Sequence, residues 1–128
     1  MLVLRTVQVP FSQDIIDKYK SPSNMLRHAR WNKWMSGIAL MKGEDLVGYV
    51  IWDNRDQEVK GLEVIDKYRG QGIGEKLLRL AEDNDILSLT VNKDNVRAIK
   101  LYKSCGWVPV KSQGQMVWMK KLKENVST

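Results

Sequence analysis

The chain has 128 residues, a length that favours one domain with an apolar core that is stable without cross-links. One cysteine allows no internal disulfide, and one histidine leaves no Cys/His cluster for zinc, so we expect no metal site. Lysine and arginine number 21 against 15 aspartates and glutamates, and the formal net charge of +6 suits an anionic ligand.

The N-terminal part predicts one strand and then helices. Residues 2–9 are typical of a strand, because the apolar run is too short for a signal peptide and lacks a small-residue cleavage site. Residues 12–34 predict one or two helices, interrupted at residues 21–23, where Ser23 or Asn24 is a good N-cap. No later stretch reaches membrane-spanning length, so we expect a soluble cytoplasmic protein with no membrane partner.

The middle of the chain predicts a hairpin, a strand and a helix. The hairpin pairs residues 38–41 with residues 46–52 across a polar turn. A strand from about residue 59 to residue 65 leads into a glycine-rich loop. An amphipathic helix follows the loop and ends near Asp83.

The C-terminal part predicts a strand, a helix and two more strands. Residues 86–91 form the strand, and residues 95–104 form a helix that Gly106 ends in a left-handed conformation. The last two strands, around residues 107–111 and 115–121, pair across a glycine turn. The chain is therefore expected to be a mixed α/β domain around a central sheet.

The loop Arg69-Gly70-Gln71-Gly72-Ile73-Gly74 lies between a predicted strand and a predicted helix. Glycine lets the backbone adopt positive φ and approach a ligand closely, while the first N–H groups of the following helix have no intrahelical partner. An anion satisfies these groups, which predicts a pyrophosphate site. The dinucleotide fingerprint needs a third glycine three residues after the second, and the nucleotide-hydrolase loop needs Gly-Lys-Ser/Thr, but Glu75 follows Gly74.

Two segments, in this order, resemble the GNAT (Gcn5-related N-acetyltransferase) superfamily. Arg69, Gly72 and Gly74 match the signature Arg/Gln-x-x-Gly-x-Gly/Ala of its acyl-CoA-binding loop. Residues 89–107 resemble the family's later strand, its Asn-x-x-Ala helix, its tyrosine and its Gly-aromatic turn. The resemblance covers about residues 36–122.

The resemblance implies an α/β (α+β) fold with a mixed, mostly antiparallel central sheet of about six to seven strands and about four flanking helices. We expect residues 1–123 to form this single domain and residues 124–128 to form a flexible tail. One departure from the family pattern is Asp66-Lys67, where a proline and an acidic residue are more usual. The turn before Tyr68 should still form.

The resemblance also implies an activity, the transfer of an acetyl group from acetyl-CoA to a primary amine by direct attack in a ternary complex. The residues implied to bind the cofactor are Val64, Ile65, Arg69, Gly70, Gln71, Gly72, Ile73, Gly74, Asn95 and Tyr102. Arg69 has a fork that suits a CoA phosphate, but it is also explained as a solvent-exposed side chain. Asn95 is explained equally well as a helix N-cap.

Acyl transfer needs an acid, a base and a group that polarises the thioester carbonyl. Tyr102 corresponds to the family's usual general acid, and a core tyrosine is the alternative. The N–H of Val64 is the candidate group that polarises the thioester carbonyl. The alternative is that this N–H makes an ordinary hydrogen bond within the sheet. Glu63 is the first candidate for the base and Glu58 the second, while a water relay with Glu63 as a solvated strand residue stays open.

The basic excess lies outside the centre of the chain. Residues 1–35 carry six basic and two acidic side chains, residues 36–108 carry eleven and twelve, and residues 109–128 carry four and one. Basic residues interleave with tryptophans in the predicted N-terminal helices, at Arg27, Arg30, Trp31, Lys33 and Trp34, and Trp118 follows later. Such a pattern allows a nucleic acid to bind, although core tryptophans with solvated basic neighbours are the simpler interpretation.

The acceptor is expected to be a small-molecule or peptide amine, and both a monomer and a homodimer are compatible with the sequence. A non-catalytic module with the same fold, binding acyl-CoA, a nucleic acid or another polyanion, is the alternative function.

Overall fold

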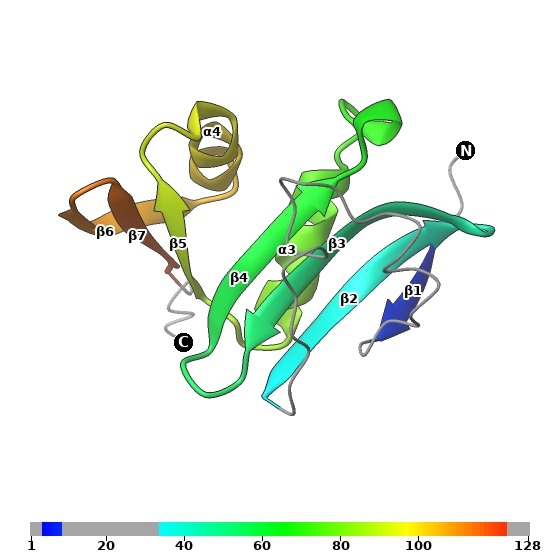
Figure 1. Ribbon diagram of the computed structural model, residues 1–128, viewed down its shortest axis with the longest axis horizontal. Coiled ribbons are helices and arrows are strands. Elements are labelled where there is room, and N and C mark those ends of the chain that lie inside the picture. Colours follow the sequence, from blue (N-terminus) through cyan, green and yellow to red (C-terminus); the bar gives the residue numbers. More distant parts are fainter. Residues whose placement is uncertain (1–3, 9–33, 123–128) are drawn as a thin grey trace, which may run out of the picture.

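The computed structural model describes residues 4–8 and 34–122, which form one seven-stranded sheet in the order β1-β2-β3-β4-β5-β7-β6 (Figure 1). Neighbouring strands are antiparallel except β4 and β5, which are parallel. The predicted fold class, a mixed and mostly antiparallel sheet with helices, is confirmed. The helices predicted over residues 12–34 lie outside the described residues except for Trp34, which is in a turn before β2 and is 42% exposed.

The described elements follow the predicted order, with bounds that differ by a few residues. They are β1 (Arg5–Gln8), β2 (Met35–Lys42), β3 (Asp45–Asp53), β4 (Glu58–Val64), the 3-10 helix η1 (Asp66–Tyr68), α3 (Ile73–Asp83), β5 (Ser88–Asn92), α4 (Val96–Ser104), β6 (Trp107–Gln113) and β7 (Met116–Lys121). The turn at Asp66-Lys67, where the chain departs from the family pattern, is the single turn of η1. Neither described α-helix is long and apolar enough to cross a membrane.

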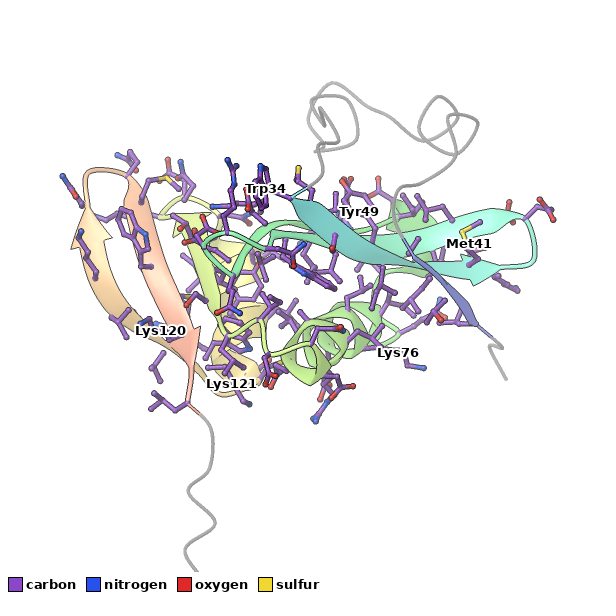
Figure 2. The ribbon with its side chains drawn as sticks, turned by 90° about the horizontal axis from the view of Figure 1, so that it is seen from below. Trp34, Met41, Tyr49, Lys76, Lys120 and Lys121 are labelled. Carbon is purple, nitrogen blue, oxygen red and sulfur yellow. The ribbon has the colours of Figure 1, made fainter. Side chains whose placement is uncertain are left out.

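The core lies between the sheet and α3, which packs across β2, β3 and β4 on one face (Figure 2). Leu77, Leu78 and Ala81 of α3 are completely buried, as their helical spacing predicts. Each fully buried leucine side chain stabilises the fold by about 1.5–3 kcal/mol. On the other part of the sheet, α4 packs against β6, and its Tyr102 lies beside the buried Trp107.

Two glycines let the helices approach closely. A Cβ added at Gly48 of β3 would lie 2.7 Å from the carbonyl oxygen of Glu63 and 3.1 Å from Cδ1 of Leu77. A Cβ added at Gly74 would lie 2.8 Å from Cδ2 of Leu101 in α4. The third glycine of the loop therefore lets the start of α3 lie directly against Leu101 of α4.

A β-bulge in β4 separates this strand from β5. Ile51 of β3 pairs with Gly61, but the next residue of β3 pairs with Val59, so Lys60 is the extra residue. A bulge bends its strand and increases the local twist. The pairing of β4 with β5 is confined to Glu58 with Ser88 and Val59 with Leu89. Beyond Val59, β4 and β5 diverge, and β4 continues toward the glycine loop paired with β3 on its other side (Figure 1).

Replacing Gly48 with alanine should destabilise the protein by about 1–3 kcal/mol, because the new methyl group meets the backbone oxygen of Glu63, which cannot rotate away. Urea unfolding measures this change in the free energy of unfolding. Gly114→Ala is the control, because Gly114 has open space around it and a φ of 57°, so only backbone strain of roughly 1 kcal/mol is added. Equal losses in the two variants would contradict the close packing at Gly48.

Candidate functional site

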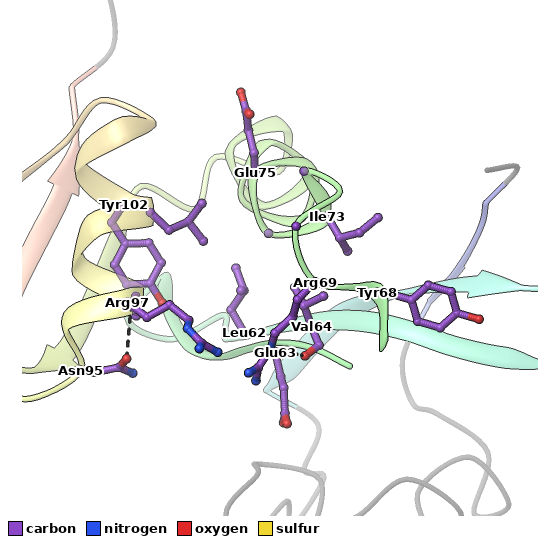
Figure 3. A pocket seen from close by; sticks show the side chains of 15 residues that line it. Leu62, Glu63, Val64, Tyr68, Arg69, Ile73, Glu75, Asn95, Arg97 and Tyr102 are labelled. Carbon is purple, nitrogen blue, oxygen red and sulfur yellow. Dashed lines mark hydrogen bonds between the residues drawn. The ribbon is translucent and has the colours of Figure 1, made fainter. Parts of the chain in front are cut away.

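The larger cavity of the site lies between β4, the glycine loop and α4 and has a volume of about 610 Å³ (Figure 3). Its lining residues are Leu62, Glu63, Val64, Tyr68, Arg69, Gly70, Gly72, Ile73, Gly74, Glu75, Asn95, Arg97, Ala98, Leu101 and Tyr102. Most of the residues predicted from the sequence therefore lie around one opening. Ile65, Gln71 and Glu58 are not among its lining residues.

A smaller cavity of about 320 Å³ adjoins the larger one. The residues that line both cavities are Leu62, Glu63, Arg69, Asn95 and Tyr102. The smaller cavity is completed by Tyr49 of β3 and by Thr90 and Asn92 of β5. The two cavities therefore meet where β4 and β5 diverge, an arrangement that allows two ligands to approach each other from different sides.

The glycine loop presents unpaired N–H groups to the larger cavity. Gly70 and Gly72 have φ values of 79° and 76°, and neither has an atom within 4 Å of the place where a Cβ would lie. The first hydrogen bond of the helical turn joins Lys76 N to the oxygen of Gly72 at 3.2 Å. Within the described chain, the N–H groups of Ile73, Gly74 and Glu75 thus have no carbonyl partner, and this helix end favours an anion.

Arg69 braces the turn that precedes the loop. Its Nε donates to the carbonyl oxygen of Val64 at 3.3 Å, and its Nη1 lies 3.1 Å from Oδ1 of Asp66. The guanidinium still lines both cavities, and 44% of the side chain is exposed. Arg69 is thus neither a simple surface residue nor a cation with all of its donors available.

The backbone N–H of Val64 points to the side on which β4 and β5 diverge. Ile65 N donates to the oxygen of Val47 in β3 at 2.9 Å, and antiparallel strands alternate the direction of their N–H groups. The N–H of Val64 therefore points away from β3, on the edge where its carbonyl meets Arg69. Ile65 is different from the sequence-based expectation, because its N–H is bonded to Val47 and its carbonyl accepts from Tyr68 N at 2.8 Å. Both backbone groups of Ile65 therefore already have a partner within the protein.

Tyr102 lies at the junction of the two cavities. Its side chain is 7% exposed, its ring centroid is 6.4 Å from that of Trp107, and burial raises its pKa to about 12. No group among the described residues is hydrogen-bonded to its hydroxyl. The phenol is therefore neutral throughout the ordinary pH range and has a donor to offer. Its raised pKa makes it a weaker acid than the unperturbed tyrosine that the sequence suggested.

The two carboxylates proposed as bases are in different positions. Glu63 lines both cavities and accepts a hydrogen bond of 2.8 Å at Oε2 from the hydroxyl of Tyr49. Glu58 lies where β4 still pairs with β5, accepts from the hydroxyl of Thr90 and has Lys60 Nζ 3.7 Å away. It lines neither cavity. Glu63, and not Glu58, thus lines the same two cavities as Tyr102.

Asn95 caps α4, since its Oδ1 accepts from Ala98 N at 3.2 Å. The N-cap interpretation is confirmed, and the side chain also lines both cavities. Sequence reasoning missed Tyr49, which is identified only by the pairing of Tyr49 with Glu63 across β3 and β4. It also missed Arg97, whose one sequence signal is its position in the first turn after the cap.

Residues 9–107 match the model of the Acetyltransferase (GNAT) family. The chain belongs to the GNAT acetyltransferase family. The match includes the glycine loop, both described α-helices and the start of β6. No curated protein sequence matches the chain.

Solved structures share the fold of this chain. A protein from Pyrococcus horikoshii is 25% identical, with a TM-score of 0.59 over 69% of this chain and 65% of its own. The PaiA N-acetyltransferase of Thermoplasma acidophilum, solved with coenzyme A, is 19% identical, with a TM-score of 0.57 over 66% and 58%. The ribosomal-protein-S18-alanine N-acetyltransferase of Escherichia coli is 16% identical, with a TM-score of 0.65 over 97% and 99%. The chain thus spans less than two thirds of the first two proteins and nearly all of the third.

Burial of Tyr102 should make the protein less stable at high pH. The folded state keeps the phenol protonated up to a pKa of about 12, whereas the unfolded chain loses this proton near 10, so stability falls as the pH rises between these values. The full loss is roughly 2–3 kcal/mol. The difference in unfolding free energy between the wild type and Tyr102→Phe, measured in urea from about pH 9 upward, should decline by up to this amount. A constant difference would show that Tyr102 is solvated.

Proposed function

We propose that the chain transfers an acetyl group from acetyl-CoA to a primary amine by direct attack in a ternary complex. The observation that carries this proposal is the divergence of β4 from β5. It leaves the outward-facing backbone edge of Val64 in the lining of the larger cavity, and Tyr102 at the junction of the two cavities. One cavity suits the donor and the other the acceptor, so that neither substrate has to leave before the other binds.

The larger cavity suits acetyl-CoA. The N–H groups at the start of α3 would hold the diphosphate, and Gly70 and Gly72 leave room for it to approach the backbone. The unpaired edge of β4 would hold the amide groups of the pantetheine arm, as an added strand does at a sheet edge. The Thermoplasma acidophilum relative was solved with coenzyme A, which supports this choice of donor.

The chemistry divides among a few groups. The amine attacks the thioester carbonyl, the new N–C bond forms, and the C–S bond then breaks to release the CoA thiolate. The N–H of Val64 would stabilise the oxyanion, because it is fixed and pointed at the divergence before the reaction begins. The hydroxyl of Tyr102 would donate to the leaving sulfur. With a pKa of about 12 it acts chiefly as a hydrogen-bond donor to the thiolate, which takes its proton from solvent, while the base takes the proton that the amine loses.

Glu63 is the proposed general base, acting directly or through a water molecule. It reaches both cavities, and the hydroxyl of Tyr49 holds one carboxylate oxygen while leaving the other free to accept a proton. Tyr49 is thus a positioning residue. Glu58 is the weaker candidate because it lines neither cavity and its carboxylate is already engaged by Thr90 and Lys60.

The acceptor proposed for the smaller cavity is an amine of a small molecule or of a peptide. The polar residues that line this cavity suit a polar molecule, and they are Tyr49, Lys60, Glu63, Arg69, Thr90, Asn92, Asn95 and Tyr102. With Lys60 and Arg69 in this lining, we expect the amine to bind on the side of Glu63. The Escherichia coli relative is named for an alanine of ribosomal protein S18, which supports a peptide amine as one class. A screen of small amines and N-terminal peptides, followed by release of free CoA thiol, tests the proposal. Tight acetyl-CoA binding without turnover on any of them would favour the non-catalytic module.

Gly72→Glu should abolish measurable acetyl-CoA binding, because a carboxylate would occupy the open space beside the helix end and repel the diphosphate. Calorimetric titration compares the variant with the wild type. Gly114→Glu is the matched control, since it adds the same charge at another positive-φ glycine with open surroundings, in the β6–β7 turn. Normal binding by the Gly72 variant would refute the location of the diphosphate.

Tyr102→Phe should lower kcat by roughly 10²- to 10³-fold, the usual contribution of an acid or a donor placed at the reacting atoms. The affinity for acetyl-CoA should stay within about twofold, because the ring that packs against Trp107 is kept. Steady-state rates with an acceptor found in the screen, together with a binding titration, separate the two effects. An unchanged kcat would remove Tyr102 from the mechanism.

A further inference from the structure

Arg97 places a guanidinium in the larger cavity, and none of the roles proposed above belongs to it. It is the second residue of α4 and lines this cavity together with Arg69. Figure 3 shows its guanidinium projecting from α4 into the opening, in front of Tyr102 and toward the side where Arg69 lies. In the described part of the chain no carboxylate or carbonyl engages it. An arginine in an opening of this kind has its whole fork available to a ligand.

The other charged side chains of the larger cavity are already engaged. Arg69 uses Nε on the carbonyl of Val64 and Nη1 on Asp66. Glu75 accepts from Arg79 at 2.7 Å, and it points away from the opening in Figure 3. Glu63 is held by Tyr49 and points to the side opposite Leu62. Arg97 is therefore, among the described residues, the cation of this cavity with the most unused donors.

We propose that Arg97 binds the diphosphate of the acyl donor from the α4 side, opposite the N–H groups of α3. This inference rests on the proposed function, because it assumes that acetyl-CoA occupies the larger cavity. A helix end offers only about half an elementary charge, whereas a guanidinium adds a full charge and two parallel N–H donors that match phosphate oxygens. Arg69, which the sequence motif suggests for the phosphate, then acts mainly as the brace of the loop.

The test compares three donors that differ in their phosphates. Acetyl-CoA has the diphosphate and a 3′-phosphate, acetyl-dephospho-CoA keeps only the diphosphate, and S-acetylpantetheine has neither. Arg97→Gln should weaken binding of the first two by about tenfold, the usual effect of losing a charge-assisted hydrogen bond, and should leave the third unchanged. Calorimetry measures the nucleotide donors, and ligand-observed NMR measures the weaker pantetheine.

Lys100→Gln is the matched control, because it removes one positive charge from an exposed position of the same helix that lies outside both cavities. It should leave all three affinities unchanged, and both variants should keep the wild-type melting temperature. Equal loss on S-acetylpantetheine, or no loss on acetyl-dephospho-CoA, would overturn the assignment of Arg97 to the diphosphate. A wild type that binds none of the donors would overturn the proposed function itself and this inference with it.

Discussion

The site depends on one interruption of the sheet, the bulge at Lys60 after which β4 no longer pairs with β5. Unpaired backbone groups are costly when they are buried away from water, so an opened sheet needs something to satisfy the exposed edge. Near the glycine loop, Arg69 satisfies the carbonyl of Val64. The remaining groups of this edge are the natural partners of an extended ligand arm with amides of its own.

The surrounding packing holds the strands apart at a fixed distance. Gly48 lets α3 settle onto β3 and β4, and Gly74 lets the start of α3 lie against Leu101 of α4. The buried face of α3 anchors it in the core, and Tyr102 with partly buried apolar side chains anchors α4, so both walls of the larger cavity are packed helices. A site built on such elements keeps its groups in position before a ligand arrives, which lowers the cost of ordering them.

Electrostatics then distinguishes side chains of the same type within a small space. Of two arginines in the larger cavity, one is engaged by its own loop and the other is open. Of two glutamates on β4, Glu63 lines both cavities. Glu58 lies where β4 still pairs with β5, and its carboxylate is bonded to Thr90. Burial keeps Tyr102 neutral, so that its hydroxyl is a hydrogen-bond donor and carries no negative charge.

The family and the order of the described elements could be predicted from the sequence because they depend on local patterns. Glycine spacing, the helical spacing of Leu77, Leu78 and Ala81, and the cap at Asn95 each depend on residues that are neighbours in the chain. Only the tertiary structure decided which N–H of β4 faces the divergence, that Glu63 and not Glu58 meets the cavities, and that Arg97 faces the same opening as Arg69. These depend on strand register, on a one-residue bulge and on the distance between two helices. A shift of one residue reverses the direction of every side chain and N–H in a strand, and no local pattern in the sequence specifies it.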